Sequence, residues 1–285
     1  MNQIIWGILS AISLGTADFL AGLSARSLGY SRVLFWIFVI SCVCLTSYAV
    51  VIDHPLVIAL SEQWLIILFG IMNTVAMLLL YRALAIGPLS LVAPIIAAHP
   101  VIVVSFAFML GSRPSAMQWL GMLLAIVGVI IVARAVRQTS DLRSRSKHRL
   151  AITIALLASL GYAILVISGQ HAVPIHGELQ TLWLGRIIAM VSLLPFLLVT
   201  RTTLGVPVKW WPLLCLQGTL DFSGLLCLLL GSRGDFAEIT AVIGSLFGAV
   251  TVVLARVFLK EQMSWFQWLG IVLIFLGVAS LTAAS

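Results

Sequence analysis

Long apolar runs alternate with short polar breaks along the whole chain of 285 residues. A helix needs about 20 mostly apolar residues to cross the hydrocarbon core of a bilayer. By that criterion the pattern predicts an all-α polytopic membrane protein with ten transmembrane helices. Because the runs are apolar on every face, the alternating strands of a membrane β-barrel are excluded. The predicted spans are 4–23, 33–52, 64–82, 89–110, 117–136, 150–170, 180–200, 211–231, 237–258 and 266–283.

The most polar break divides the chain into two units of five spans each. It covers residues 137–149 (RQTSDLRSRSKHR), which we interpret as a basic loop between units 1–136 and 150–285. The tetrapeptide QWLG at 118–121 recurs at 267–270, an offset of 149 residues. Because each unit has an odd number of spans, the second must enter the membrane from the opposite side. The sequence therefore predicts two inverted repeats, an architecture common among secondary transporters.

The amino-acid composition also indicates that lipid, not water, surrounds most of the protein. Hydrophobic residues make up 62% of the chain and charged residues only 9%, whereas soluble domains carry about 25% charged residues. The partners we predict are therefore the lipid bilayer and a small-molecule substrate. The net charge of +7 comes from 16 Lys and Arg that lie mostly in short loops. Such a distribution reports membrane orientation and argues against a nucleic-acid partner.

The basic residues are distributed unevenly between the two sides of the predicted membrane. Thirteen follow spans 1, 3, 5, 7 and 9, against three elsewhere: Arg113, Arg186 and Arg233. Since basic loops stay in the cytoplasm, we expect a multi-pass protein of the cell (inner) membrane with both termini outside. The thirteen are Arg26, Arg32, Arg82, Arg134, Arg137, Arg143, Arg145, Lys147, Arg149, Arg201, Lys209, Arg256 and Lys260.

Two stretches resemble the EamA domain of the drug/metabolite transporter superfamily. They are residues 81–94 (YRALAIGPLSLVAP) and the Leu-Lys-Glu to Leu-Gly-Val pattern of 259–278. The resemblance implies a transporter of small metabolites whose cavity is lined by the first, third, fourth, sixth, eighth and ninth helices. It also implies termini inside the cell, contrary to the charge count, which we follow here. Where such repeats usually carry Glu after the fourth helix, this chain has Ser112 in the first repeat and Glu261 in the second. We therefore expect Glu261 to be structural and not catalytic.

Ionisable residues inside predicted spans are candidates for function, because charge is costly in the membrane. Asp18 lies in the first span and Asp221 near the middle of the eighth. Their carboxylates can bind a substrate amine or take up a proton; the alternative is a packing role. We expect Asp221→Asn to abolish transport without lowering abundance. Arg186 can pair with either carboxylate or extend to the interface, and we favour the interface.

Proline and histidine interrupt the fourth predicted span. Pro100 follows His99, and Pro94 lies one turn earlier, so we predict a break in this helix. Such a break frees backbone carbonyls that can face a cavity. His99 is a candidate proton relay or ligand donor, with a hydrogen bond to a neighbouring helix as the alternative.

Aromatic and small residues add further expectations. Tyr81, Tyr162 and Phe222 can stack against a substrate or simply pack between helices. Small residues at spacing suited to close helix approach occur at Gly7, Ala11 and Gly15, and at Gly244 and Gly248. Glu238 is expected to cap the ninth helix, and Gln170 and His171 are candidates for a gate.

Function follows from architecture and from missing motifs. We predict a secondary transporter, and more specifically an exporter, of small organic metabolites such as amino acids or their derivatives. An uptake permease and an uncoupled facilitator are the alternatives. The sequence has no P-loop to bind ATP, no catalytic motif and no cluster with metal-ligand spacing, so neither enzyme activity nor a cofactor or metal is predicted. The energy source would be a proton gradient or the substrate's own gradient, in a monomer or homodimer.

Overall fold

The computed structural model describes residues 2–53, 63–111, 113–138, 142–231, 240 and 243–283, and no strand occurs in these ranges. Helices dominate because a backbone in lipid must satisfy its own hydrogen bonds. The elements are α1 (Asn2–Leu28), α2 (Tyr30–Val51), α3 (Gln63–Ile86), α4 (Leu89–Ala97), α5 (His99–Met109), α6 (Ala116–Gln138), α7 (Leu142–His176), α8 (Glu178–Val199), η1 (Val208–Trp210), α9 (Trp211–Gly231), α11 (Phe247–Phe258) and α12 (Trp265–Ala283).

Every predicted span coincides with helix in the described residues. Eight segments are long and apolar enough to cross a membrane, with α4 and α5 forming one of them, and α11 and α12 are shorter apolar helices. The predicted ten-helix membrane fold is therefore confirmed. The predicted basic loop 137–149 is wrong in extent, since α6 runs to Gln138 and α7 begins at Leu142. Lys and Arg are good helix formers, so a charged sequence can extend the helices beyond the membrane.

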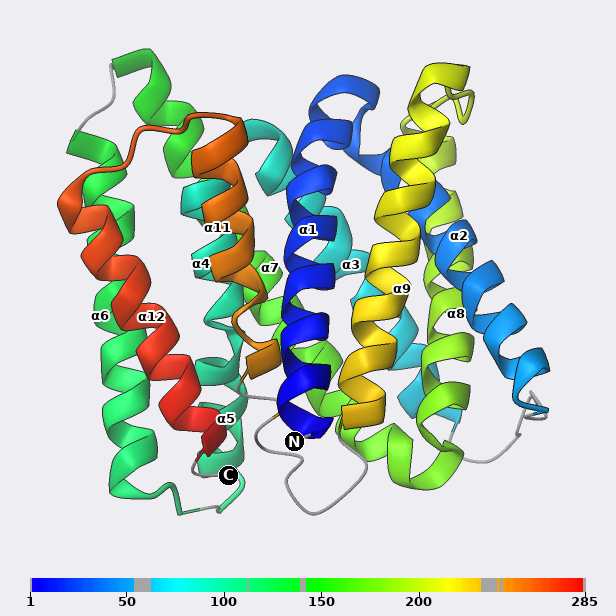
Figure 1. Ribbon diagram of the computed structural model, residues 1–285, viewed down its shortest axis with the longest axis horizontal. Helices are drawn as coiled ribbons and strands as arrows, with labels where there is room; N and C mark the ends of the chain where they lie inside the picture. The colour runs from blue at the N-terminus through cyan, green and yellow to red at the C-terminus, as the bar shows by residue number, and fades with distance from the viewer. Residues whose placement is uncertain are drawn as a thin grey trace.

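Both ends of the chain lie at the same end of the bundle (Figure 1). We call this the termini end; it holds the start of α1 and the last turn of α12. The opposite end, at the top of Figure 1, holds Arg26, Arg134, Arg149, Arg256 and Lys260, and we call it the basic end. Because α1 starts at the termini end and α7 starts at the basic end, the two repeats cross the membrane in opposite directions.

Helix packing follows the pseudo-symmetry of the repeats. Helix α1 packs against α9, and its counterpart α7 packs against α3, the counterpart of α9. Likewise α2 packs against α9 and α8 against α3, while α6 and α12 pack against each other at one side of the bundle (Figure 1). The largest contacts between the repeats therefore have mates, as expected if a two-fold axis relates them.

Glycines bring α6 and α12 into close contact. A β-carbon at Gly121 would lie 2.8 Å from the carbonyl oxygen of Gly277, and one at Gly128 would lie 2.6 Å from that of Gly270. Gly121 and Gly270 occupy equivalent positions in the two copies of the QWLG motif. Gly128 and Gly277 are likewise equivalent, so the contact of Gly121 with Gly277 and that of Gly270 with Gly128 are mates across the pseudo-two-fold axis, and close approach of this kind is how small residues join membrane helices.

The fourth helix of each repeat is interrupted at the same place. Helix α4 ends at Ala97 and α5 begins at His99, with Ala98 at φ −80° and ψ 2° between them. In the second repeat Leu246 precedes α11 with nearly the same dihedral angles, φ −75° and ψ 3°. The two interruptions meet, because a β-carbon at Gly248 would lie 3.0 Å from the β-carbon of Ala97.

Both predicted stripes of small residues lie in this region. Gly7 on α1 faces Ile243, and Gly15 faces the backbone of Phe247. The hydroxyl of Thr251 on α11 also donates to the carbonyl oxygen of Gly15 at 2.9 Å. Helix α1 therefore packs closely against the start of α11.

Glu238, expected to cap the ninth helix, lies outside the described residues.

Candidate substrate site

An ion pair lies inside the bundle, between α8 and α9. Nη2 of Arg186 donates to Oδ2 of Asp221 at 2.7 Å, and the side chains are only 5% and 11% exposed. The guanidinium also lies over the ring of Phe38 on α2, 5.5 Å from its centroid. The expectation that Arg186 extends to the interface is therefore wrong. A partner on the neighbouring helix offsets the cost of burying the charge, which outweighs access to water.

Asp18 on α1 is the second carboxylate at this level of the bundle. It lies near enough to Asp221 for the two negative charges to repel each other. Unlike Asp221, it is partly exposed, and it makes no hydrogen bond or ion pair with any other described residue. Since Arg186 neutralises Asp221, Asp18 is the carboxylate that is left to interact with a ligand.

Tyr81 lies within electrostatic reach of both carboxylates. Its hydroxyl accepts a hydrogen bond from Nε2 of Gln217 at 2.9 Å. The side-chain oxygen of Gln217 in turn accepts from the hydroxyl of Ser24 at 2.9 Å. This chain of bonds joins α3, α9 and α1, and its members are almost fully buried, at 2%, 0% and 0% exposure. It forms a closed polar layer between the carboxylates and the basic end.

His99 and Tyr162 contact each other, and Tyr162 lies within electrostatic reach of Asp18. Their ring centroids are 5.8 Å apart, and both side chains are partly exposed. Nδ1 of His99 lies 3.1 Å from the carbonyl oxygen of Ile96, in the last turn of α4. The Tyr162 hydroxyl donates to the sulfur of Met77 at 2.7 Å. His99 therefore uses a carbonyl that the helix break has released.

The structure brings five of the six candidates together and leaves one apart. Phe222 follows Asp221 in sequence, but its ring faces Tyr48 of α2, with 6.2 Å between the centroids. It packs with Leu45 and Leu179 in a separate apolar cluster. Neighbouring residues on a helix point about 100° apart, so α9 directs only Asp221 toward the other candidates.

Sequence reasoning missed Gln217 and Ser24. An amide in the apolar eighth span was a usable signal, because such groups need a partner in the membrane. Ser24 carries no comparable signal, since a serine hydroxyl can bond to its own helix.

The two prolines lie on either side of the helix break. Pro94 lies inside α4, and Pro100 lies in the first turn of α5.

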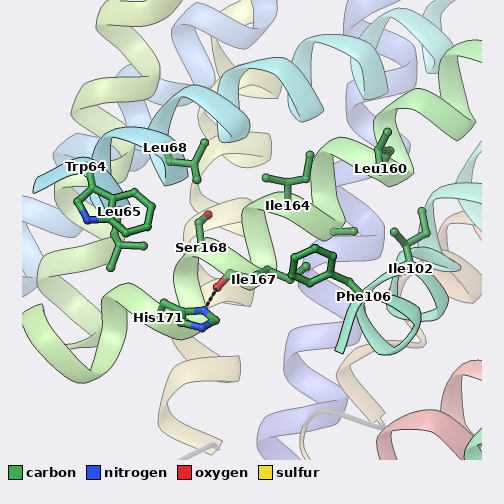
Figure 2. A pocket seen from close by; sticks show the side chains of 11 residues that line it. Trp64, Leu65, Leu68, Ile102, Phe106, Leu160, Ile164, Ile167, Ser168 and His171 are labelled. Atoms are coloured by element: carbon green, nitrogen blue, oxygen red, sulfur yellow. Dashed lines mark hydrogen bonds between the residues drawn. The ribbon is translucent and has the colours of Figure 1, made fainter. Parts of the chain in front are cut away.

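An apolar groove lies between α3, α5 and α7, in the half of the bundle toward the termini end. Its volume is about 340 Å³. Figure 2 shows that its polar side chains are Ser168 and His171; each bonds to a carbonyl oxygen of its own helix, that of Leu165 and that of Ile167 respectively. The other lining residues are Trp64, Leu65, Leu68, Ile102, Phe106, Leu160, Ala163, Ile164 and Ile167. The groove therefore offers apolar contact but no unpaired polar group.

The residues near Asp18 suit binding of one positive charge. With Arg186 and Asp221 paired, the cluster carries a net charge of −1 when Asp18 is ionised and none when Asp18 holds a proton, and the Tyr162 and His99 rings lie in contact with each other nearby. In the described part of the chain no three His, Cys, Asp or Glu side chains gather as a metal site would require. The arrangement can hold an amine or a proton within the membrane.

The inverted repeats and the polar centre between them define a class, the polytopic membrane transporters. The chain belongs to the EamA-like transporter family, whose pattern it matches over residues 1–134 and 149–283. Each match covers one repeat, as the resemblance to the EamA domain implied. A structure described only as a crystal structure of a protein matches with a TM-score of 0.67 at 16% identity, covering 99% of this chain and 97% of its own. At that identity the likeness shows the fold alone, and no curated protein matches the chain.

Proposed function

We propose that this transporter exports small amine-bearing organic metabolites, such as amino acids or their derivatives, by alternating access between its two repeats. One observation carries the proposal: Asp18 is partly exposed and has no bonding partner among the described residues, while the neighbouring carboxylate is already paired. An ammonium group would offset the cost of keeping this charge in the membrane. The partly exposed rings of Tyr162 and His99 would contact the rest of the substrate, and the buried Tyr81 would close the site toward the basic end.

Alternating access is supported by the paired helix breaks. Discontinuous helices in corresponding positions of two inverted repeats mark the substrate site in many transporters. Here the helices interrupted at Ala98 and Leu246 contact each other, with Gly248 against Ala97. Rocking of one repeat against the other would expose Asp18 to each side in turn. A proton can occupy Asp18 on the return step, which would couple export to the proton gradient.

The first experiment compares metabolites in cells and medium for strains that overproduce the protein, lack it, or carry Asp18→Asn. We expect an amine-bearing compound to accumulate outside only with the intact protein. Losing a charge-assisted hydrogen bond costs about 1.5–3 kcal/mol, so Asp18→Asn should weaken substrate binding by about 10- to 150-fold. Asp18→Glu should keep part of the activity because it keeps the charge.

Asp53→Asn is the matched control. It makes the same chemical change at an exposed position after α2, where φ is 52°, and Asn tolerates that conformation well. Depletion of the compound from the medium would indicate uptake in place of export. Equal flux in proteoliposomes with and without a pH gradient would indicate an uncoupled facilitator. If all strains had the same metabolites, or if Asp18→Asn transported as well as the wild type, the proposed role of Asp18 would be wrong.

A further inference from the structure

A carboxylate of the second repeat bonds to the start of a helix of the first. Glu261 lies between α11 and α12, and its side chain accepts three hydrogen bonds at the basic end. Oε1 accepts from the backbone N–H of Leu89 at 3.0 Å. Oε2 accepts from the backbone N–H of Ser90 at 3.0 Å and from the Ser90 hydroxyl at 2.6 Å.

Helix α4 has no cap of its own. Its N-cap residue is Pro88, which makes no side-chain capping bond. The first N–H groups of a helix need acceptors, and the helix dipole favours a negative charge at that end. Glu261 therefore supplies from the opposite repeat the cap that local sequence usually supplies.

Neighbouring bonds hold this contact in place. Nε2 of Gln267 on α12 donates to the Ser90 hydroxyl at 3.3 Å. Nη1 of Arg256 donates to the backbone carbonyl of Glu261 at 2.7 Å. On the other side, Nη2 of Arg26 donates to the carbonyl oxygen of Gly87 at 2.6 Å, immediately before α4. Helix α1 thus bonds to the connection before α4, α12 bonds to the first turn of α4, and α11 holds the backbone of Glu261 itself.

The capped start of α4 packs against α1 one turn from Asp18 toward the basic end, where a β-carbon on Gly22 would lie 2.9 Å from the side chain of Leu89. All nine residues of α4 are buried, as is the Ser24, Gln217 and Tyr81 layer. At the sequence position in the first repeat that corresponds to Glu261, the chain has Ser112, so the repeats are unequal here. A carboxylate in only one repeat stabilises closure of one end of the transporter over closure of the other.

We propose that Glu261 is the gating residue of the basic end: its cap on α4 holds that end closed, and the cap separates when the repeats rock. The proposal extends the alternating-access function given above. Breaking the cap exposes its donors to water, which replaces the lost bonds in part, so the closure is reversible. Without the carboxylate, the bundle should open at the basic end more often.

Cysteine labelling measures that opening directly. Ala25 on α1 is 3% exposed and contributes no side-chain bond to the cap. Ala25→Cys would be introduced after replacing Cys42, Cys44, Cys215 and Cys227, and a membrane-impermeant thiol reagent applied to vesicles of each orientation. We expect Glu261→Gln to raise the labelling rate from the basic end by about tenfold or more, because charge-assisted bonds are lost.

Glu178→Gln is the matched control, since it removes a carboxylate from the first turn of α8 at the termini end. It should leave the labelling rate from the basic end unchanged. Ser90→Ala removes one of the three bonds and should give an intermediate rate, which keeps the test informative if Glu261→Gln folds poorly. Equal labelling rates in Glu261→Gln, Ser90→Ala and the parent would overturn the proposal.

A second measurement relates the gate to transport. With Ser90→Cys and Gln267→Cys, a short bifunctional thiol reagent should stop transport, and reduction should restore it. Unchanged transport in the bridged protein would overturn the gating role. The labelling assay needs no substrate: a normal labelling response in a protein that moves no amine-bearing compound would refute the proposed substrate and leave the gate standing.

Discussion

Breaking the buried ion pair should destabilise the protein strongly, and repairing the charge balance should restore part of the loss. Asp221→Asn leaves Arg186 with a positive charge in a site where its side chain is 5% exposed and where its Nη1 already has no hydrogen-bond partner. Removing one partner of a buried pair costs about 3–5 kcal/mol. That cost corresponds to roughly two to three and a half powers of ten in the folding equilibrium.

The double variant Arg186→Gln with Asp221→Asn tests the reason for the loss. Two neutral amides can bond to each other, so no unpaired charge remains. We expect the double variant to be more stable than Asp221→Asn alone, with a coupling energy of at least about 1 kcal/mol in the double-mutant cycle. Asp18→Asn, which breaks no bond to a described residue, should not destabilise the protein.

Stability would be measured on purified protein in detergent by thermal unfolding, together with abundance in the membrane. A melting temperature of Asp221→Asn equal to that of the wild type would refute the reasoning, as would a double variant less stable than both single ones. The structure also changes one expectation from the sequence: loss of transport in Asp221→Asn would come with reduced abundance. Asp18 is therefore the cleaner position at which to test substrate binding.

Three other predictions follow from the packing and the charges. Gly128→Val should abolish folding, because its side chain would meet backbone 2.6 Å away, whereas Gly205→Val, with nothing within 4 Å, should fold normally; fluorescence size-exclusion chromatography distinguishes them. Gln217→Leu should cost about 1–3 kcal/mol by leaving two buried hydroxyls without their partner, and a melting temperature like that of the wild type would contradict this. A reporter fused after Ser285 that is active only when exported should give signal, because we expect the basic end to face the cytoplasm; a signal from a cytoplasm-specific reporter would reverse that orientation.

Most residues of the candidate site could be predicted from the sequence one at a time. Asp18, Asp221 and His99 are ionisable groups in apolar runs, and the cost of such groups in lipid makes each one conspicuous. The structure places them with Tyr81 and Tyr162 on helices that the family resemblance assigned to the cavity. Phe222 carried no such signal of cost, since an aromatic ring in a membrane helix is equally at home in any apolar contact.

The sequence predicted which residues belong to the candidate site better than it predicted which residues bond to one another. Arg186 and Asp221 are 35 residues apart on neighbouring helices, and hydrophobicity alone does not give the rotation of either helix. The bond from Glu261 to α4 spans 171 residues or more between different repeats. A loop glutamate can accept hydrogen bonds from many possible donors, so only the folded bundle identifies these.

The sequence by itself determined the membrane class, the spans and the repeat, because hydrocarbon demands about 20 apolar residues for each crossing and because the QWLG motif occurs twice. These properties depend on composition and order along the chain. Only the tertiary structure decided that Arg186 turns inward, that Asp18 has no partner among the described residues, and that Glu261 caps a helix of the other repeat. Those outcomes depend on which faces of separate helices meet, and close packing between helices sets that geometry.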